Sequence, residues 1–428
     1  CRMARIFDAV SGKICRKDVW KKIRNRLIEQ YCGKPLLQCC FCWNRGKNMT
    51  VFKSIWRWIR REAVLSAAIL LAAVSAFLVP PDSAYLGYVD YRTLAILFCL
   101  MAVMAGLQRL GIFDRLAQEL LSRVKRRSSM VLILWGLCFF FSMFITNDVS
   151  LITFVPFTMV VLRRIGGETE RKLLVPVVVM QTVAANLGSM LTPIGNPQNL
   201  YLYGSSGMSA VSFLRLMLPY TLLSLGMLAV WNVLLCRKHR GNAVIDLPEK
   251  KPLDSRKKLI AYLVLFALCL LTVAHLLPFS VTLAVVLAYL LLCDRSVFRS
   301  VDYSLLLTFA GFFVFIGNMG RIPAFCDFLA GIIGGRELLT AVLSSQIISN
   351  VPAALLLSGF TENTPALIVG TNLGGLGTLI ASMASLISFK AVAREKKQQV
   401  GTYLLCFTLA NLLFLAVLLG LAVLLGAI

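Results

Sequence analysis

Four short polar segments interrupt the long apolar runs of this chain, and their residue types suit the binding of ions and small solutes. Two of them, Thr146-Asn147-Asp148 and Ser349-Asn350, place a hydroxyl beside an amide. The other two, residues 185–199 and 370–378, are rich in Asn, Thr and Gly. A helix that breaks inside a bilayer leaves N–H and C=O groups unpaired, which is tolerated only where the break lines a cavity or a binding site. Half-helix amino ends then attract anions, and carbonyl, Asn and Thr oxygens suit Na⁺.

These four breaks are predicted to form a binding site together. The alternative interpretation is structural, with glycines that pack helices and Ser or Asn residues that cap them. That interpretation suits one break alone, whereas four breaks in mirrored positions favour a functional site. The candidate substrate-binding residues are Thr146, Asn147, Asp148, Thr192, Pro193, Gly195, Asn196, Ser349, Asn350, Val351, Thr371, Asn372, Gly374 and Thr378.

Asp148 is the one clear acid deep in an apolar run. A carboxylate inside a membrane is costly and by default indicates a function. Three roles are open for it: a Na⁺ ligand, a carrier of a proton, or a cap for the half-helix that follows. Because the predicted membrane centre contains no Lys or Arg, an anion would be held by helix ends, neutral donors and co-bound cations. This favours a small or weakly charged solute over citrate, or an ion as the only cargo.

The composition is that of a polytopic membrane protein. Of the 428 residues, 58% are hydrophobic and 15% are charged, and the mean hydropathy is +0.78. Soluble domains contain about 45–50% apolar and about 25% charged residues, so a soluble or disordered chain is excluded. The net charge of +24 lies between the apolar runs, which argues against a nucleic-acid partner. Runs of about 20 apolar residues predict an all-α protein that spans the bilayer.

The positions of Lys and Arg predict the topology, since these residues collect on the cytoplasmic side of a membrane. We place the amino terminus inside and treat residues 129–162 and 337–360 as re-entrant hairpins. This arrangement puts 40 of the 44 basic residues on the cytoplasmic side. It gives nine spans, an external carboxyl terminus and a multi-pass protein of the plasma or inner membrane.

The second half of the chain repeats the order of elements in the first. Val89-Asp90-Tyr91 and Val301-Asp302-Tyr303 open the runs that precede the two hairpins. Asn186-Leu187-Gly188 and Asn372-Leu373-Gly374 lie in the interrupted helices that follow them. Since the hairpins are predicted to enter from opposite sides, the pattern indicates an inverted-repeat transporter with two re-entrant hairpins and two interrupted helices. The expected domains are residues 49–235, a cytoplasmic loop over 236–258, and 259–428.

Residues 1–48 differ from the rest of the chain. They contain six of the thirteen cysteines and are strongly basic. The cysteine spacing matches no zinc module, and no histidine follows nearby. We interpret this segment as a basic cytoplasmic tail, or as upstream sequence translated in front of a start at Met49.

The motifs Thr146-Asn147-Asp148, 191–196 and 349–352 resemble those of the ion transporter superfamily, and the resemblance covers about residues 62–428. This superfamily includes citrate and dicarboxylate/sodium symporters, arsenite permeases and a class of Na⁺/H⁺ antiporter. The resemblance implies an elevator-like transport domain and a homodimeric scaffold. It also implies a Na⁺ site at Thr146, Asn147, Gly195 and Asn196, beside Asp148. A mirror site would use Ser349, Asn350, Thr371 and Asn372, although its second unwound segment lacks the Thr-Pro pair.

We therefore predict a secondary active transporter for a small anion or oxyanion, either citrate/dicarboxylate-like or arsenite-like. Na⁺ or H⁺ would be the coupling ion, in symport or antiport, with no other cofactor. The alternative is a cation/proton (Na⁺/H⁺) antiporter, for which Asp148 would be essential. An enzyme is disfavoured because the sequence offers no nucleophile–base set and no second deep acid. The expected partners are the solute and the lipid bilayer.

Overall fold

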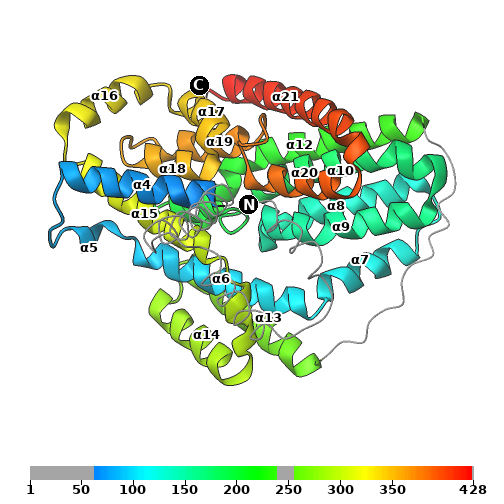
Figure 1. Ribbon diagram of the computed structural model, residues 1–428, viewed down its shortest axis with the longest axis horizontal. Coiled ribbons are helices and arrows are strands. Elements are labelled where there is room, and N and C mark those ends of the chain that lie inside the picture. The colour runs from blue at the N-terminus through cyan, green and yellow to red at the C-terminus, as the bar shows by residue number, and fades with distance from the viewer. Residues whose placement is uncertain (1–61, 239–254, 427–428) are drawn as a thin grey trace, which may run out of the picture. The chain divides into compact units, whose positions relative to one another are not determined.

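The computed structural model describes residues 62–238 and 255–426, and every regular element in these ranges is a helix (Figure 1). The predicted tail over residues 1–48 lies outside the described residues, as does most of the loop 236–258. Residues from Val64 onward form one compact unit. The helices are α4 (Ala63–Leu78), α5 (Tyr85–Tyr88), α6 (Tyr91–Arg109), α7 (Ile112–Ser122), α8 (Arg127–Ile145), α9 (Asn147–Ile165), α10 (Gly167–Ser189), α11 (Pro197–Ser206), α12 (Ala210–Lys238), α13 (Arg256–Val273), α14 (Phe279–Cys293), η1 (Arg295–Ser300), α15 (Tyr303–Met319), α16 (Pro323–Ile333), α17 (Glu337–Ile348), α18 (Asn350–Ser358), α19 (Thr364–Gly374), α20 (Met383–Glu395), η2 (Lys397–Gln399) and α21 (Val400–Leu424).

Five of the described helices are long and apolar enough to cross a membrane: α6, α8, α10, α12 and α21. A sixth span results if α15 and α16, which are bent by 107°, count as one. The sequence predicted nine spans, and part of the difference is helix length. The apolar helices α4, α14 and α17 contain only 16, 15 and 12 residues, whereas about 20 are needed to cross the hydrocarbon core. The prediction of an all-α, polytopic membrane protein is confirmed.

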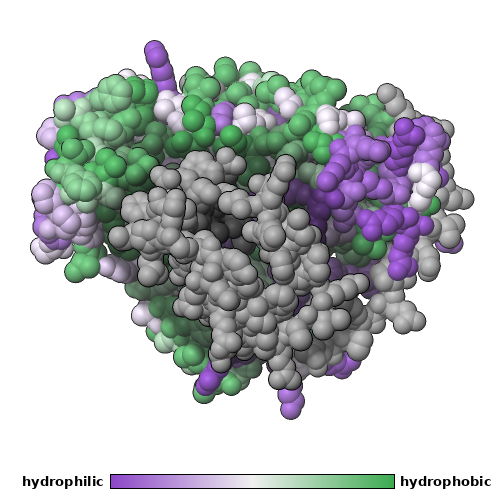
Figure 2. Space-filling view, in the orientation of Figure 1, coloured by the Kyte–Doolittle hydropathy of each residue, from purple (hydrophilic) through white to green (hydrophobic). Residues whose placement is uncertain are grey.

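Apolar side chains cover much of the outside of this bundle. Figure 2 shows them over α16, α17 and α21, with hydrophilic residues gathered where α20 meets α21. Leu405, Leu409 and Leu413 of α21 are each at least 60% exposed. A water-soluble monomer rarely exposes an apolar surface of this extent, so the surface is that of a protein embedded in lipid.

Two helix pairs break at a single residue with the same unusual backbone. Thr146 joins α8 to α9 with φ 67° and ψ 152°, and Ser349 joins α17 to α18 with φ 73° and ψ 155°. Residues other than glycine rarely adopt this region of φ and ψ. It costs such a residue about 1–3 kcal/mol and persists only where neighbouring groups hold the backbone in place. The two predicted hairpin tips therefore share one strained geometry.

Two interrupted helices pack against these pairs. After α10 ends at Ser189 the chain is non-helical until α11, and after α19 ends at Gly374 it is non-helical until α20. Glycine allows each interrupted helix to approach its neighbour closely. A Cβ at Gly188 would lie 2.0 Å from the Phe139 carbonyl oxygen of α8, and one at Gly374 would lie 2.6 Å from Ser345 Oγ of α17. In both halves, the glycine of the Asn-Leu-Gly sequence brings the interrupted helix against the first helix of the pair.

The helices that precede the pairs also begin alike. The Asp90 carboxylate accepts from the Thr93 amide at 3.0 Å, and Asp302 accepts from the Leu305 amide at 3.1 Å. Each aspartate thereby satisfies one of the amide groups that a helix start leaves unpaired. The Val-Asp-Tyr identity noted in the sequence thus corresponds to the same N-cap in both halves.

The carboxyl end of α6 is held by contacts among four residues. Gly106 lies against the ring of Tyr262, where an added Cβ would come within 2.2 Å of a ring carbon. The Tyr262 hydroxyl donates to Asp294 at 3.0 Å, and Arg109 lies 3.9 Å from the same carboxylate.

The carboxyl end of α15 is held by the same four residue types. Gly317 lies against the ring of Tyr88, again with 2.2 Å to an added Cβ. Arg321 donates to Asp82 at 2.7 Å and to the Tyr88 hydroxyl at 3.2 Å. The hydrogen bond from Arg321 holds the pKa of the Asp82 carboxyl below its ordinary range. Equivalent helices in the two halves are therefore anchored by equivalent Gly-Tyr-Asp-Arg contacts.

The close approach at Gly188 can be tested by adding one methyl group. Gly188→Ala should destabilise the protein by about 1–3 kcal/mol because the α8 backbone must move. Gly136→Ala is the matched control, since it lies on α8 and its Cβ would meet nothing within 4 Å. Thermal unfolding of the purified protein in detergent measures both variants. Equal melting temperatures for the two variants would contradict the packing described.

Candidate functional site

The first amide after each strained residue bonds to an interrupted helix. The Asn147 N–H donates to the Gly195 carbonyl at 3.3 Å, and the Asn350 N–H donates to the Ala381 carbonyl at 2.9 Å. The Ser349 hydroxyl also donates to Ala381, at 3.4 Å. Both acceptor carbonyls lie in non-helical segments, so each break supplies the partner that another break needs.

Asparagine side chains join the first helix pair to both interrupted helices. The Asn147 Nδ2 donates to Asn186 Oδ1 at 3.1 Å. The same oxygen accepts from the Ser382 hydroxyl at 3.0 Å, and Asn186 Nδ2 lies 3.5 Å from the Gly375 carbonyl. Asn186 of the first half is therefore hydrogen-bonded to the break of the second half.

A second set of side-chain amides links the residues that follow α10 to α19 of the other half. Asn196 Nδ2 donates to Ser189 Oγ at 2.7 Å and to Asn372 Oδ1 at 3.4 Å. Asn372 Nδ2 in turn donates to Asn199 Oδ1 at 2.6 Å. We refer to Asn147, Asn186, Asn196, Asn199 and Asn372 as the asparagine cluster, and each of its members is at least 95% buried.

This cluster is uncharged, and hydrogen-bonding atoms without a partner occur in it and on residues next to it in the sequence. No charged side chain is fully buried among the described residues, and apart from Tyr, Trp and Cys the fully buried polar side chains there are Ser, Thr, Asn or Gln. Asn196 Oδ1, both polar atoms of Gln198 and Asp148 Oδ1 are buried and have no hydrogen-bond partner among the described groups. Buried polar atoms are normally paired, so these atoms are available to a ligand. That oxygen of Asp148 does not cap α9, which disfavours the capping role.

The structure brings some of the predicted residues together and places others apart. Asn147, Gly195, Asn196 and Asn372 meet at or beside the asparagine cluster. The Asn350 N–H and the Ser349 hydroxyl donate to the Ala381 carbonyl, and the Thr371 hydroxyl bonds to its own helix at the Leu367 carbonyl. Asn350 also lies near Asn372, since a Cβ at Gly375 would come within 3.0 Å of Asn350 Nδ2 and 3.2 Å of the Asn372 carbonyl oxygen. The remaining predicted residues lie at the edges of the breaks. Thr146 has the strained backbone, and the Thr192 hydroxyl donates to the Met143 carbonyl. Pro193 lies between α10 and α11, Val351 lies in α18, Gly374 packs on Ser345, and Thr378 is exposed.

Several residues that hold the site were absent from the predicted set. Asn186 and Asn199 stand inside the sequences that marked the breaks, so the repeated Asn-Leu-Gly pattern was the available signal for Asn186. Gln346 gave no such signal. Its Nε2 donates to the Gly374 and Leu376 carbonyls, both at 2.9 Å, and its Oε1 accepts from the Thr378 amide at 2.9 Å. It satisfies backbone groups that the end of α19 leaves free.

A polytopic helical protein whose broken helices meet at a buried polar cluster has the architecture of a membrane transporter. Comparison with known proteins gives the family. The profile of the citrate transporter family matches residues 52–365, and the chain belongs to that family.

Several of its relatives are named as transporters or membrane proteins. An uncharacterized transporter of Methanocaldococcus jannaschii is 35% identical over 330 residues, which cover 77% of this chain and 88% of the relative. The inner membrane protein YbiR of Escherichia coli is 31% identical over 353 residues, covering 78% and 89%. The silicon efflux transporter of rice is 31% identical over 168 residues, covering 39% and 33%. These names favour a transporter over an enzyme.

The asparagine cluster can be tested at Asn372. Asn372→Leu should lower the free energy of unfolding by about 1–3 kcal/mol because Asn199 Oδ1 stays buried and loses its partner. Asn411→Leu is the control, since Asn411 is fully buried but donates only to its own helix, at the Phe407 carbonyl. Chemical unfolding in detergent compares the two variants. A larger loss for Asn411→Leu would show that the cluster does not hold the halves together.

Proposed function

We propose that this protein is a secondary active transporter for a small anion or oxyanion, coupled to Na⁺ or H⁺. The observation that carries the proposal is the asparagine cluster, which joins both interrupted helices, together with the unused buried acceptors of Asn196, Gln198 and Asp148. A ligand that pairs these atoms is stabilised, because unpaired polar groups are costly away from water. A site that exchanges its ligand must keep them available.

The two halves form an inverted repeat in this proposal, with re-entrant helix pairs that enter from opposite sides of the membrane. The strained residues Thr146 and Ser349, the two Asp N-caps and the two Gly-Tyr contacts all recur in the same order. A repeat inverted across the membrane lets the same site open to either side by rocking or sliding of one part against another. The amino terminus faces the cytoplasm in this arrangement, and two copies associate as a homodimer.

The surroundings of the site favour a small, weakly charged solute. Lys and Arg do not occur among the fully buried described residues, so a multiply charged anion would lack a fixed countercharge. Amides, hydroxyls and backbone N–H groups suit the oxygens of an oxyacid. The description of the family, which refers to citrate, and the name of the rice relative, which refers to silicon, are consistent with an oxygen-rich solute.

Asp148 is the proposed link to the coupling ion. Its Oδ1 is buried and has no partner in the described structure, close in sequence to Asn147, which bonds to the Gly195 carbonyl. A carboxylate together with amide and carbonyl oxygens is a suitable ligand set for Na⁺, with the side-chain oxygens of Thr146 and Asn196 as further ligands. The same carboxylate could carry a proton. Either ion adds positive charge beside the solute when it binds, which couples the two.

Flux into proteoliposomes tests the function. Labelled citrate, succinate, arsenite and silicic acid would be offered under an imposed Na⁺ gradient and then under a pH gradient, with protein-free liposomes as the control. We expect accumulation of at least one solute that follows one of the gradients. Na⁺/H⁺ exchange without uptake of any solute would overturn the proposal in favour of an antiporter.

Asp148→Asn should abolish gradient-driven accumulation because the amide neither carries a proton nor adds negative charge to a Na⁺ site. Asp327→Asn, which removes an exposed carboxylate of α16, should retain accumulation. Both variants would be compared with the unmodified protein in the same flux assay, after their melting temperatures show that they fold. Full coupled uptake by Asp148→Asn would exclude Asp148 from coupling.

A further inference from the structure

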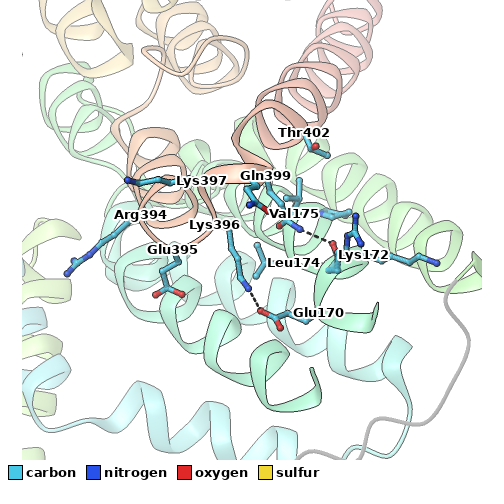
Figure 3. Close-up of a pocket in the computed structure, with 13 residues that line it drawn as sticks. Glu170, Lys172, Leu174, Val175, Arg394, Glu395, Lys396, Lys397, Gln399 and Thr402 are labelled. Atoms are coloured by element: carbon cyan, nitrogen blue, oxygen red, sulfur yellow. Dashed lines mark hydrogen bonds and ion pairs between the residues drawn. The ribbon is translucent and has the colours of Figure 1, made fainter. Parts of the chain in front are cut away.

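A wide hollow lies where the beginning of α10 meets the junction of α20, η2 and α21 (Figure 3). Its volume is about 1120 Å³, and Leu174 and Val175 form part of its floor. We call it the basic hollow because cations predominate in its lining. The charged residues around it are Arg171, Lys172, Arg394, Lys396 and Lys397, with Glu170 and Glu395.

The two acids of the basic hollow are already paired. Lys396 Nζ lies 2.6 Å from Glu170 Oε1, a contact that Figure 3 shows as a dashed line, and Glu395 pairs with Arg163 outside the hollow. Arg171, Arg394 and Lys397 form no ion pair with another described residue. The hollow therefore presents unneutralised positive charge and suits an anion.

A second depression, the apolar groove, runs between α12 and α21. Its volume is about 680 Å³. Its lining is almost entirely apolar and includes Gly226, Trp231 and Leu234 of α12, and Leu409 and Leu413 of α21. Leu234, Leu409 and Leu413 are each more than half exposed. The groove therefore opens to the surroundings of the helices, and lipid acyl chains are the apolar molecules found there.

One face of α21 connects the two depressions. Thr402 lines the basic hollow, and Cys406, Leu409 and Leu413 line the apolar groove. Spacings of four, three and four residues place these side chains in one row along a helix. At 1.5 Å per residue the row is about 17 Å long, which is close to the hydrocarbon depth of one leaflet, about 15 Å. A polar end and an apolar continuation of this length match an amphiphile.

We propose that the basic hollow and the apolar groove together bind one anionic phospholipid. Its phosphate lies among Arg171, Arg394 and Lys397, and one acyl chain lies along the row of α21 that ends at Leu413. A soluble anion would use the hollow alone and leave the apolar continuation without a role. A zwitterionic lipid would fill the groove but would place a positive group among the cations.

The lipid would connect helices that carry the asparagine cluster. Asn186 is on α10, whose first turns line the hollow, and the break before α20 contains Ser382. Bound lipid would therefore hold the amino end of α10 and the carboxyl end of α20 against α21. The proposal concerns the binding site itself and holds whichever solute the protein transports.

Native mass spectrometry of the purified full chain in detergent tests this site. The probes are dioleoylphosphatidylglycerol, dioleoylphosphatidylcholine and the soluble glycerol 3-phosphate. We expect the anionic lipid to be retained in preference to phosphatidylcholine. Arg171→Gln with Lys397→Gln should weaken that preference about 25-fold, since each cation near an anionic surface contributes about fivefold. Arg256→Gln with Lys257→Gln is the control, because this exposed Arg-Lys pair at the start of α13 lines neither depression.

The groove is tested separately by filling it. Gly226→Phe should reduce retention of phosphatidylglycerol, whereas Gly420→Phe, an equally open glycine of α21 outside the groove, should leave retention unchanged. Melting temperatures would establish that all four variants fold. Equal retention of the two lipids, equal effects of the two phenylalanines, or displacement of the lipid by glycerol 3-phosphate would each overturn the proposal.

Discussion

The requirement that every backbone polar group inside a membrane finds a partner governs this structure. Helices that break at membrane depth expose N–H and C=O groups that lipid cannot satisfy. Here the breaks satisfy one another: the amide after Thr146 bonds to the Gly195 carbonyl, and the amide after Ser349 bonds to the Ala381 carbonyl. The asparagine cluster adds the side-chain bonds that connect the two interrupted helices. Because the breaks depend on each other, the site exists only when both halves of the chain are assembled.

Close helix packing makes this mutual satisfaction geometrically feasible. Gly188 and Gly374 let each interrupted helix lie against the first helix of a pair, at the turn that leads into the strained residue. Gly106 and Gly317 let two tyrosine rings lock the ends of α6 and α15. In lipid the hydrophobic effect does not drive helices together, so contacts between small residues and interhelical hydrogen bonds take that role. The sites of broken backbone and the sites of closest packing therefore occur together.

The sequence predicted a large part of this arrangement. Helix class, the two single-residue breaks and the two interrupted helices follow from polar residues inside apolar runs, since such residues are costly in a membrane. The hydrogen-bond partners of the polar side chains were harder to predict. The bond from the Ser349 hydroxyl to the Ala381 carbonyl was not predicted, because a backbone carbonyl carries no signal in the residue type. Gln346 was missed for a related reason: it acts on backbone carbonyls 28 and 30 residues away, and one glutamine in an apolar helix forms no pattern. The sequence predicted nine spans where five or six helices of the described residues are long and apolar enough to cross a membrane, since short apolar helices and full spans have similar compositions.

The most direct test of the account is the accessibility of the asparagine cluster from the two sides of the membrane. In a variant whose native cysteines are replaced, Ser382→Cys would be treated with a membrane-impermeant thiol reagent applied to one face and then, in separate vesicles, to the other. Ser75→Cys, equally buried in α4 away from the cluster, is the control. The account predicts that Ser382→Cys reacts from both faces while Ser75→Cys reacts from neither. Failure of Ser382→Cys to react from either face would show that the cluster is a sealed structural core and not part of a transport path.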